Sequence, residues 1–176
     1  MSELGCYTTS TGQRIGLRFV EENDVGLLVE LFQRLSPESQ RLRFQLYTAK
    51  LPEERLWQEA ARLCRYDPQR QVAIVALFTE GDGREHAVGV ARFIRATIGD
   101  TEAEVAVVVR DDFQRRGLGK HLLLTLAEKA RNLGLTHFTA WVLDENVRLM
   151  KLIKDMELKN VESHTRHGQR KIRVPL

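Results

Sequence analysis

Cysteine and long apolar runs are both scarce in this chain of 176 residues. Its two cysteines, Cys6 and Cys64, lie far apart in the sequence, which excludes a disulfide framework and a zinc site made by these two alone. Of the five histidines, His164 and His167 come closest to a metal-ligand spacing, but they fall in a polar tail. We therefore expect no bound metal.

The longest apolar stretch covers residues 105–109, and five residues cannot cross a lipid bilayer. Residues 1–16 contain no apolar run, so no signal peptide is expected. With four prolines and 12 glycines, the chain is neither collagen-like nor dominated by linkers. These absences favour a soluble protein of the reducing cytoplasm with no membrane partner.

The charge balance is mildly basic, since 27 lysines and arginines against 24 acidic residues give a formal net charge of +3. That excess suits an anionic ligand but is too small to indicate nucleic acid by itself. The basic tail over residues 164–173 has no interleaved aromatic residues, so a nucleic-acid partner is not expected. The length and the 43% of hydrophobic residues suit a single domain over residues 1–176, as a monomer or a homodimer.

Hydrophobic periodicity predicts the order of the secondary-structure elements. Strands are expected at residues 15–20, 72–78, 87–96, 101–110 and 136–143, with two short strands closing the chain. Helices are expected after Asn23 or Asp24, after Ser36, after Leu51, and over residues 117–133 and 146–156. The middle strands form an antiparallel meander, and the strand, glycine turn, long helix and strand that follow form a βαβ unit. The predicted fold class is α+β: a mixed, mostly antiparallel central sheet flanked by helices, with a βαβ cofactor-binding unit.

The turn of that βαβ unit is the most informative segment, because a buried strand leads through residues 114–120 directly into a helix. Unpaired N–H groups at a helix N-terminus form an anion site, strengthened by the helix dipole. Gly117 and Gly119 remove Cβ atoms where a phosphate must approach the backbone. Positive charge comes from Arg115, Arg116 and Lys120. The segment predicts a pyrophosphate site, with a tight turn carrying solvated arginines as the alternative.

Two other phosphate loops are excluded at this turn. The dinucleotide fingerprint needs glycine or alanine three residues after Gly119, where the chain has Leu122. A P-loop needs glycine at position 114 and serine or threonine at position 121, where the chain has Gln114 and His121. The loop therefore belongs to neither of these nucleotide-binding motifs.

The run Gln114-Arg115-Arg116-Gly117-Leu118-Gly119 resembles the Gln/Arg-x-x-Gly-x-Gly/Ala motif of the GNAT superfamily of acyl-CoA-dependent N-acyltransferases. The apolar strand before it, the leucine-rich helix after it and the element order of nearly the whole chain support the resemblance. It implies an N-acetyltransferase with acetyl-CoA as cosubstrate and an amine as acceptor. It also implies that residues 114–120, from Gln114 to Lys120, hold the CoA pyrophosphate.

The same resemblance assigns residues around the rest of the cofactor. The strand before the loop is expected to splay from the next parallel strand, so that the pantetheine arm pairs with the backbone at Val107 and Val109. Asn146 matches an asparagine that often contacts CoA in the family. Its alternative role is a simple helix N-cap.

Acyl transfer requires a base, since an alkylammonium has a pKa of about 10.4 in water and only the neutral amine attacks. Glu104, on the strand that ends in the loop, is the leading candidate, and its neighbours Ala103 and Val105 predict the apolar surroundings that suit a general base. Glu102 is the alternative, two residues earlier and on the same face of the strand. The alternative interpretation is that both are solvent-facing strand glutamates.

One departure from the family pattern concerns the last helix. Many members have a tyrosine there, four residues before a Gly-Phe pair, as the acid that protonates the leaving thiolate. Here Ile153 stands at the tyrosine position and Glu157-Leu158 replaces Gly-Phe. The departure keeps open a second reading, a catalytically silent acyl-CoA-binding regulatory module.

A narrower resemblance rests on residues 35–39 (Leu-Ser-Pro-Glu-Ser), on Arg43-Phe44 and on residues 103–112. These are similar to the acyltransferase domain of bacterial protein lysine acetyltransferases, in which the glutamate matching Glu104 is the assigned base. The resemblance implies a protein lysine as acceptor, with a small-molecule amine as the other possibility. Some relatives carry a fused nucleotide-sensing or synthetase-like module, and the length predicts none here.

Overall fold

One twisted sheet organises the chain. The computed structural model describes residues 3–45 and 51–176, and within them eight strands form a sheet in the order β1-β2-β3-β4-β5-β6-β8-β7. The strands are β1 (Glu3–Thr8), β2 (Arg14–Phe19), β3 (Gln71–Thr79), β4 (Glu85–Ile94), β5 (Glu102–Val109), β6 (His137–Leu143), β7 (Glu162–Arg166) and β8 (Gln169–Pro175). Every neighbouring pair is antiparallel except β5 and β6, which are parallel. This arrangement confirms the predicted meander and βαβ crossover.

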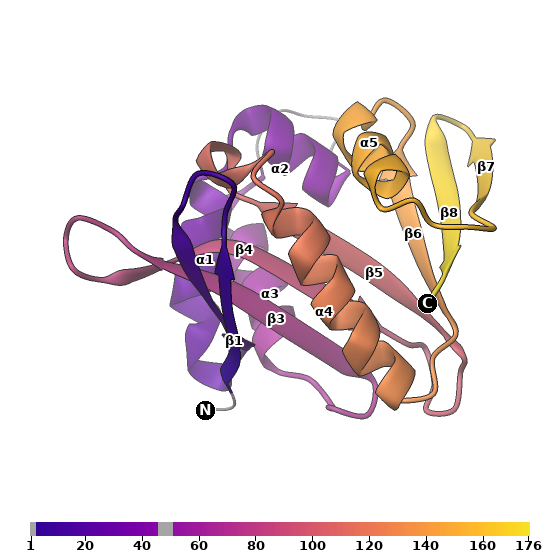
Figure 1. Cartoon of the computed structure of the whole chain (residues 1–176), viewed down its shortest axis with the longest axis horizontal. Coiled ribbons are helices and arrows are strands. Elements are labelled where there is room, and N and C mark those ends of the chain that lie inside the picture. The colour runs from indigo at the N-terminus through magenta and orange to yellow at the C-terminus, as the bar shows by residue number, and fades with distance from the viewer. Residues whose placement is uncertain (1–2, 46–50) are drawn as a thin grey trace.

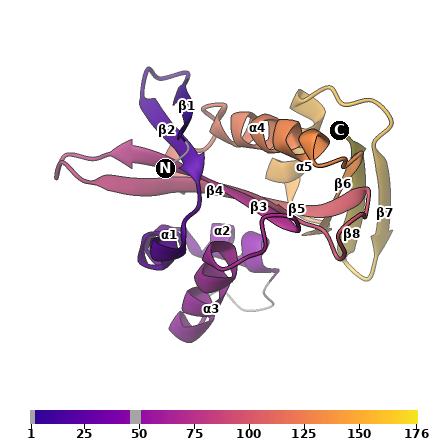
Figure 2. The same ribbon diagram turned by 90° about the horizontal axis from the view of Figure 1, so that it is seen from below.

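Helices cover both faces of the sheet (Figures 1 and 2). On one face lie α1 (Val25–Gln33), α2 (Pro37–Phe44) and α3 (Glu53–Cys64), and on the other lie α4 (Leu118–Asn132) and α5 (Val147–Asp155). Two short 3₁₀ helices, η1 (Glu22–Asp24) and η2 (Asp111–Phe113), precede α1 and the glycine turn. Among the described helices none combines the length and apolar character needed to cross a membrane.

The core consists of one apolar layer on each side of the sheet. On one side, leucines of α4 pack against β3, β4 and β5, and Leu122 and Leu126 are fully buried. On the other side, Phe32 of α1 and Ala60 of α3 pack against the opposite face of β3 and β4. Because both faces are covered, β3 is an almost continuous buried run instead of an alternating one.

The strand over Glu3–Thr8 was not predicted, so the strand expected first in the chain is the second. β1 lies at an edge of the sheet, and most of its side chains are exposed. Only Leu4 and Tyr7 pack on the core. An edge strand of this kind lacks the apolar alternation by which strands are detected.

β8, which carries most of the basic tail, lies between β6 and β7 and not at an edge. Two of its basic side chains are paired with carboxylates. Arg173 contacts Glu102 at 2.9 Å and Glu162 at 3.1 Å, and Arg170 pairs with Asp144. Part of the basic tail therefore neutralises acidic side chains in the sheet and in the turn after β6.

The packing of α4 predicts a large contrast between two leucines of the same helix. Leu122 is fully buried against the sheet, whereas Leu124 is 45% exposed. We expect Leu122→Ala to lower the free energy of unfolding by about 2–5 kcal/mol, because it leaves a cavity under the helix. Leu124→Ala, the matched control, should change it by less than about 1 kcal/mol. Urea unfolding of both variants checks this, and equal losses would contradict the packing described.

Candidate active site

The parallel strands β5 and β6 pair over only three residues each. Their register joins Glu102 to His137, Ala103 to Phe138 and Glu104 to Thr139, and then ends, although β5 continues to Val109. Figure 1 shows the two strands diverging from this point toward α5. The splay expected from the sequence is present in the structure.

The splay leaves one edge of β5 without a neighbouring strand. The N–H of Arg110 donates to the C=O of Val88 on β4 at 2.9 Å, so residues at even positions direct their backbone groups toward β4. Alternate residues point to opposite edges, and Val105, Val107 and Val109 therefore direct theirs into the gap. An extended ligand carrying amides could pair with this edge as an added strand does.

Gln114 closes the upper end of that edge. Its Nε2 donates to the C=O of Val109 at 2.9 Å, and its Oε1 accepts from Arg148 of α5 at 3.1 Å. Val107 and Val109 were both expected to pair with a pantetheine arm. Gln114 already binds the Val109 carbonyl, whereas it does not bind the carbonyl of Val107. The side chain of Gln114, the first residue of the motif, thus connects β5 to α5.

The loop backbone turns sharply before α4. Arg115 and Gly117 both have positive φ, +57° and +83°. The Tyr7 hydroxyl of β1 donates to the C=O of Arg116 at 3.0 Å. A Cβ at Gly117 would lie 2.2 Å from the same hydroxyl oxygen. The N-terminal hairpin therefore supports the loop and leaves room only for glycine at position 117.

Two of the three cations of the loop contact neighbouring elements. Arg116 bonds to Gln13 of the N-terminal hairpin, and its guanidinium lies 5.4 Å from the ring centre of Phe113. Lys120 donates to the C=O of Asp155 at 2.9 Å, at the end of α5. Arg115 is exposed. Two of the three side chains thus stabilise neighbouring elements.

The remaining residues expected at the cofactor contribute mainly through the backbone or from α5. The Leu118 side chain is buried between α4 and the sheet, with 1% of its surface exposed, so only its backbone can contact a ligand. Gly119 lies at the start of α4, close to Leu152 of α5. Asn146 caps α5, with its Oδ1 accepting from the N–H of Leu149 at 3.1 Å. This contact is the N-cap role that the sequence left as one of two alternatives.

A polar network ties α2 to the loop. The Asp111 carboxylate accepts from the N–H and hydroxyl of Ser36 at 2.9 and 2.8 Å, and from the hydroxyl of Ser39 at 2.7 Å. Ser36 is also the N-cap of α2, as predicted. Although burial opposes it, these hydrogen bonds lower the pKa of Asp111 below its ordinary value. The carboxylate is thus ionised and fixed at neutral pH.

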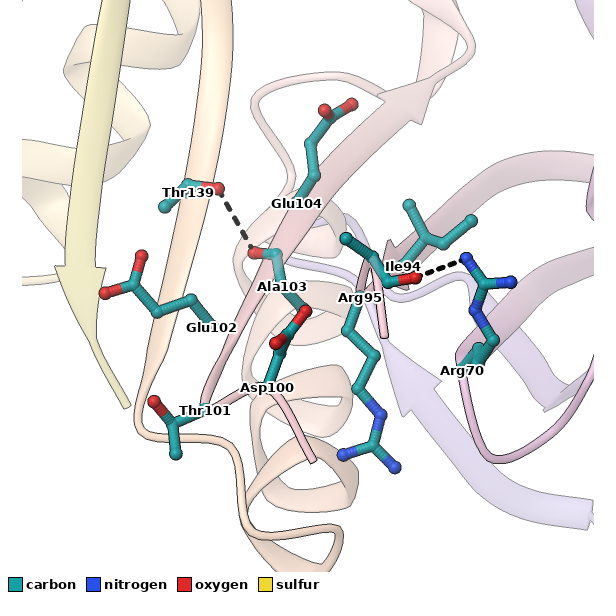
Figure 3. Close-up of a pocket in the computed structure, with 10 residues that line it drawn as sticks. Arg70, Ile94, Arg95, Asp100, Thr101, Glu102, Ala103, Glu104 and Thr139 are labelled. Carbon is teal, nitrogen blue, oxygen red and sulfur yellow. Dashed lines mark hydrogen bonds between the residues drawn. The ribbon is translucent and has the colours of Figure 1, made fainter. Parts of the chain in front are cut away.

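The face of β5 opposite α4 carries the carboxylates. Glu102 and Glu104 share this face, as predicted, and line a hollow of about 610 Å³ with Ile94 and Thr139 (Figure 3). Glu104 is exposed, because its sequence neighbours Ala103 and Val105 point under α4. The prediction that Glu104 has apolar surroundings, which was based on its sequence neighbours, is therefore wrong. Arg173 pairs with Glu102 at 2.9 Å, whereas the described residues offer Glu104 no ion pair.

Several residues that shape the site were not predicted. Tyr7 lies in the strand that periodicity missed, and Asp111 and Ser39 act through contacts between segments more than 70 positions apart. The one signal that could have found them is the run over residues 35–39, since a second serine three positions after the N-cap has no capping role of its own.

Comparison with known sequences places the chain among acetyltransferases. The model of the acetyltransferase (GNAT) family matches residues 31–157. Acetyltransferase Pat of Mycolicibacterium smegmatis is 41% identical over 63 residues, which are 36% of this chain and 19% of that protein. An acetyltransferase of Pseudomonas aeruginosa is 32% identical over 123 residues, 70% of this chain and 63% of that protein. The chain thus covers less than two thirds of either relative.

Solved structures agree with this placement. The GNAT domain of PAT from S. lividans has a TM-score of 0.82 at 26% identity and covers 99% of this chain and 97% of its own. A cAMP-binding acyltransferase from Mycobacterium smegmatis has a TM-score of 0.64 at 26% identity, over 99% of this chain and 47% of that one. The predicted fold class and the resemblance are confirmed.

The support of the loop by Tyr7 predicts that Gly117→Ala is more damaging than alanine at another left-handed glycine. Left-handed backbone costs an L-residue about 1–2 kcal/mol, and displacing the Tyr7 hydroxyl costs about 1 kcal/mol more. Gly134→Ala, the matched control, has φ +78° with nothing near its Cβ and should show the backbone cost alone. Urea unfolding measures both. The additional variant Tyr7→Phe should recover part of the loss in Gly117→Ala, and no recovery would contradict the steric explanation.

The Asp111 network predicts a pH-dependent contribution to stability. Because the folded-state pKa is lowered, the stabilisation is complete above the unfolded value of about 3.9 and is lost as the pH falls through the folded value. We expect Asp111→Asn to cost about 1–3 kcal/mol at pH 7, and the difference from wild type to shrink below about pH 4. Asp155→Asn, at an exposed position, is the control. A loss that stays constant from pH 7 to pH 3 would be inconsistent with a charged network.

Proposed function

Because this chain belongs to the acetyltransferase (GNAT) family, we propose that it is an acetyl-CoA-dependent N-acetyltransferase that acts on a primary amine. The observation that carries the proposal is the open edge of β5. It begins where the pairing with β6 ends, at Glu104, and leads to the loop before α4. One strand thus connects a candidate base with a candidate anion site.

The residues present fit an acyl-CoA. The start of α4 follows directly on the glycine turn at Gly117, and the first N–H groups of a helix have no intrahelical partner and can bind a pyrophosphate. Val107 offers backbone groups to the amides of a pantetheine arm. The apolar face of α5, which includes Leu152 and Ile153, is only partly buried and can cover such an arm. When bound, acetyl-CoA would supply the acetyl group as an activated thioester.

We assign the CoA contacts to the same positions as the sequence did, now divided by how each can act. Backbone groups would make the contacts at Val107, Leu118 and Gly119 and in the turn at Arg115, Arg116 and Gly117. At Val109 the N–H would make the contact, because the carbonyl is bound by Gln114. Gln114 and Lys120 hold the loop and α5 in place. Asn146 orients the start of α5 through its capping bond.

Glu104 is the proposed general base. Its carboxylate is exposed in a hollow on the face of β5 where the gap begins, so an amine entering from this face reaches it directly or through one water. The proton leaves the acceptor nitrogen for a Glu104 oxygen, which frees the lone pair that attacks the acyl carbon. The new C–N bond would replace the thioester C–S bond, and the CoA thiolate would leave. Glu102 is less suited, because Arg173 already occupies its carboxylate.

The acceptor we propose is a protein lysine, because residues 35–39, Arg43-Phe44 and residues 103–112 resemble bacterial protein lysine acetyltransferases, with a small-molecule amine as the other class. A second function is favoured by one observation. Ile153 occupies the position of the usual acid and cannot protonate a leaving thiolate. A silent acyl-CoA-binding module would need no such acid.

The assignment of Glu104 predicts a selective loss of turnover. With acetyl-CoA and a panel of amines and lysine peptides, Glu104→Gln should lower kcat by about 100-fold, because the amide cannot accept the proton. The affinity for acetyl-CoA should stay within about twofold, since the loop is untouched. Glu102→Gln, the matched control on the same strand, should retain most of the activity. CoA release and equilibrium binding of acetyl-CoA measure the two quantities.

Each alternative gives a different result in the same assays. Full activity of Glu104→Gln, with loss in Glu102→Gln, would transfer the role to Glu102. Tight acetyl-CoA binding by wild type without turnover of any amine would favour the silent module.

A further inference from the structure

Two arginines lie beside Glu104 on the acceptor side of the sheet. Arg92 lies on β4, two residues before Ile94, which is the register partner of Glu104. Alternate residues of a strand share a face, and directly opposed residues do too, so Arg92 and Glu104 face the same side. Arg43 comes from the C-terminal turn of α2, which packs against β5 on that side. The Arg92 charge lies close enough to lower the pKa of Arg43.

Neither arginine is neutralised by direct contact within residues 3–45 and 51–176. No hydrogen bond or ion pair joins a carboxylate of this part of the chain to Arg43 or Arg92, and the Nε atoms of both are shielded from solvent without a partner. Glu59 and Glu104 both lie near enough to act on the Arg43 charge, but the Glu59 carboxylate is bound to Arg62 at 2.8 Å and the Glu104 carboxylate makes no direct contact with Arg43. Two neighbouring guanidinium groups thus each have a buried Nε–H that makes no hydrogen bond.

Such an arrangement is unfavourable without an anion. Burial and the Arg92 charge lower the pKa of Arg43 to about 10, although the Glu59 and Glu104 charges oppose this shift, so Arg43 remains a cation at neutral pH. Like charges in a partly desolvated site repel, and unfilled guanidinium donors add a desolvation cost. A carboxylate relieves both, because its two oxygens match the donor geometry of a guanidinium group.

We propose that Arg43 and Arg92 bind a carboxylate carried by the amine acceptor, and so select acceptors whose amine lies within a side chain's length of an acidic group. The inference rests on the proposed function and names its substrate class. The site belongs to the acceptor and not to the acyl donor, since it shares the Glu104 face, whereas the proposed CoA loop and α5 lie with α4 on the other side (Figure 2). The carboxylate can come from an acidic residue next to a lysine or from an amino acid itself.

The test compares acceptors that differ only by a carboxylate and its amide. One pair is a lysine peptide with glutamate or glutamine beside the lysine, and the other is free lysine and lysinamide. The quantity measured is the ratio of kcat/KM for the carboxylate over the amide, in wild type and in Arg43→Gln and Arg92→Gln. We expect a ratio of about ten or more in at least one pair for wild type, falling toward one in both variants.

Three controls make the ratio specific. Arg131→Gln, an exposed arginine of α4, should keep the wild-type ratio. Arg43→Lys and Arg92→Lys preserve the charge and guard against loss of folding, and should keep an intermediate ratio because the forked donor is lost. Succinyl-CoA and butyryl-CoA, compared as donors, show whether the carboxylate belongs to the acyl group. A preference confined to succinyl-CoA would overturn the assignment to the acceptor.

Binding separates this inference from the proposed function. The acetylated forms of the same peptides and of lysine and lysinamide are titrated into the protein, which needs no turnover. Absence of turnover on any amine would refute the proposed function alone, while tighter binding of the carboxylate form, lost in Arg92→Gln, would still support the arginine site. Equal binding of the two forms in every pair would overturn it.

Discussion

The three-residue pairing between β5 and β6 is the constraint on which the site depends. A parallel pair that continued to Val109 would satisfy the edge of β5 with backbone and leave no place for a ligand. Because the pairing ends at Glu104, the open edge, the loop and the carboxylate become parts of one path. The cost of unpaired backbone is limited at its upper end, where Gln114 satisfies the Val109 carbonyl.

Contacts from distant segments keep this open edge in shape. Tyr7 supports the loop from the N-terminal hairpin, and Asp111 binds the start of α2 to the same loop through two serines. Arg148 adds α5 to the network through Gln114. The elements on both sides of the sheet are therefore connected through the residues that precede α4, and α2, which carries Arg43, is one of them.

Local signals in the sequence were sufficient for most of the fold. Pattern and capping place β2, the meander, α4 and the crossover, and Ser36 caps α2 as its position before proline indicates. What failed were inferences from adjacency. Glu104 is flanked by apolar residues in the chain, yet the pleat turns them to the other face, and Arg116 bonds to a hairpin more than 100 positions earlier. The roles of Tyr7 and Asp111 depend on such long-range contacts, which a single sequence does not encode locally.

The pleat of β5 also explains how one strand serves donor and acceptor without mixing them. Odd residues bury their side chains under α4 and turn their backbone groups into the gap, while even residues present Glu102, Glu104 and Ala106 to the opposite face. A shift of register by one residue would move a carboxylate into the α4 core and the valines into the hollow. The burial of Ala103 and Val109 therefore fixes more than the core. It holds Glu104 at the one position where the strands part and, on the proposed function, keeps the base on the side from which Arg43 and Arg92 receive the acceptor.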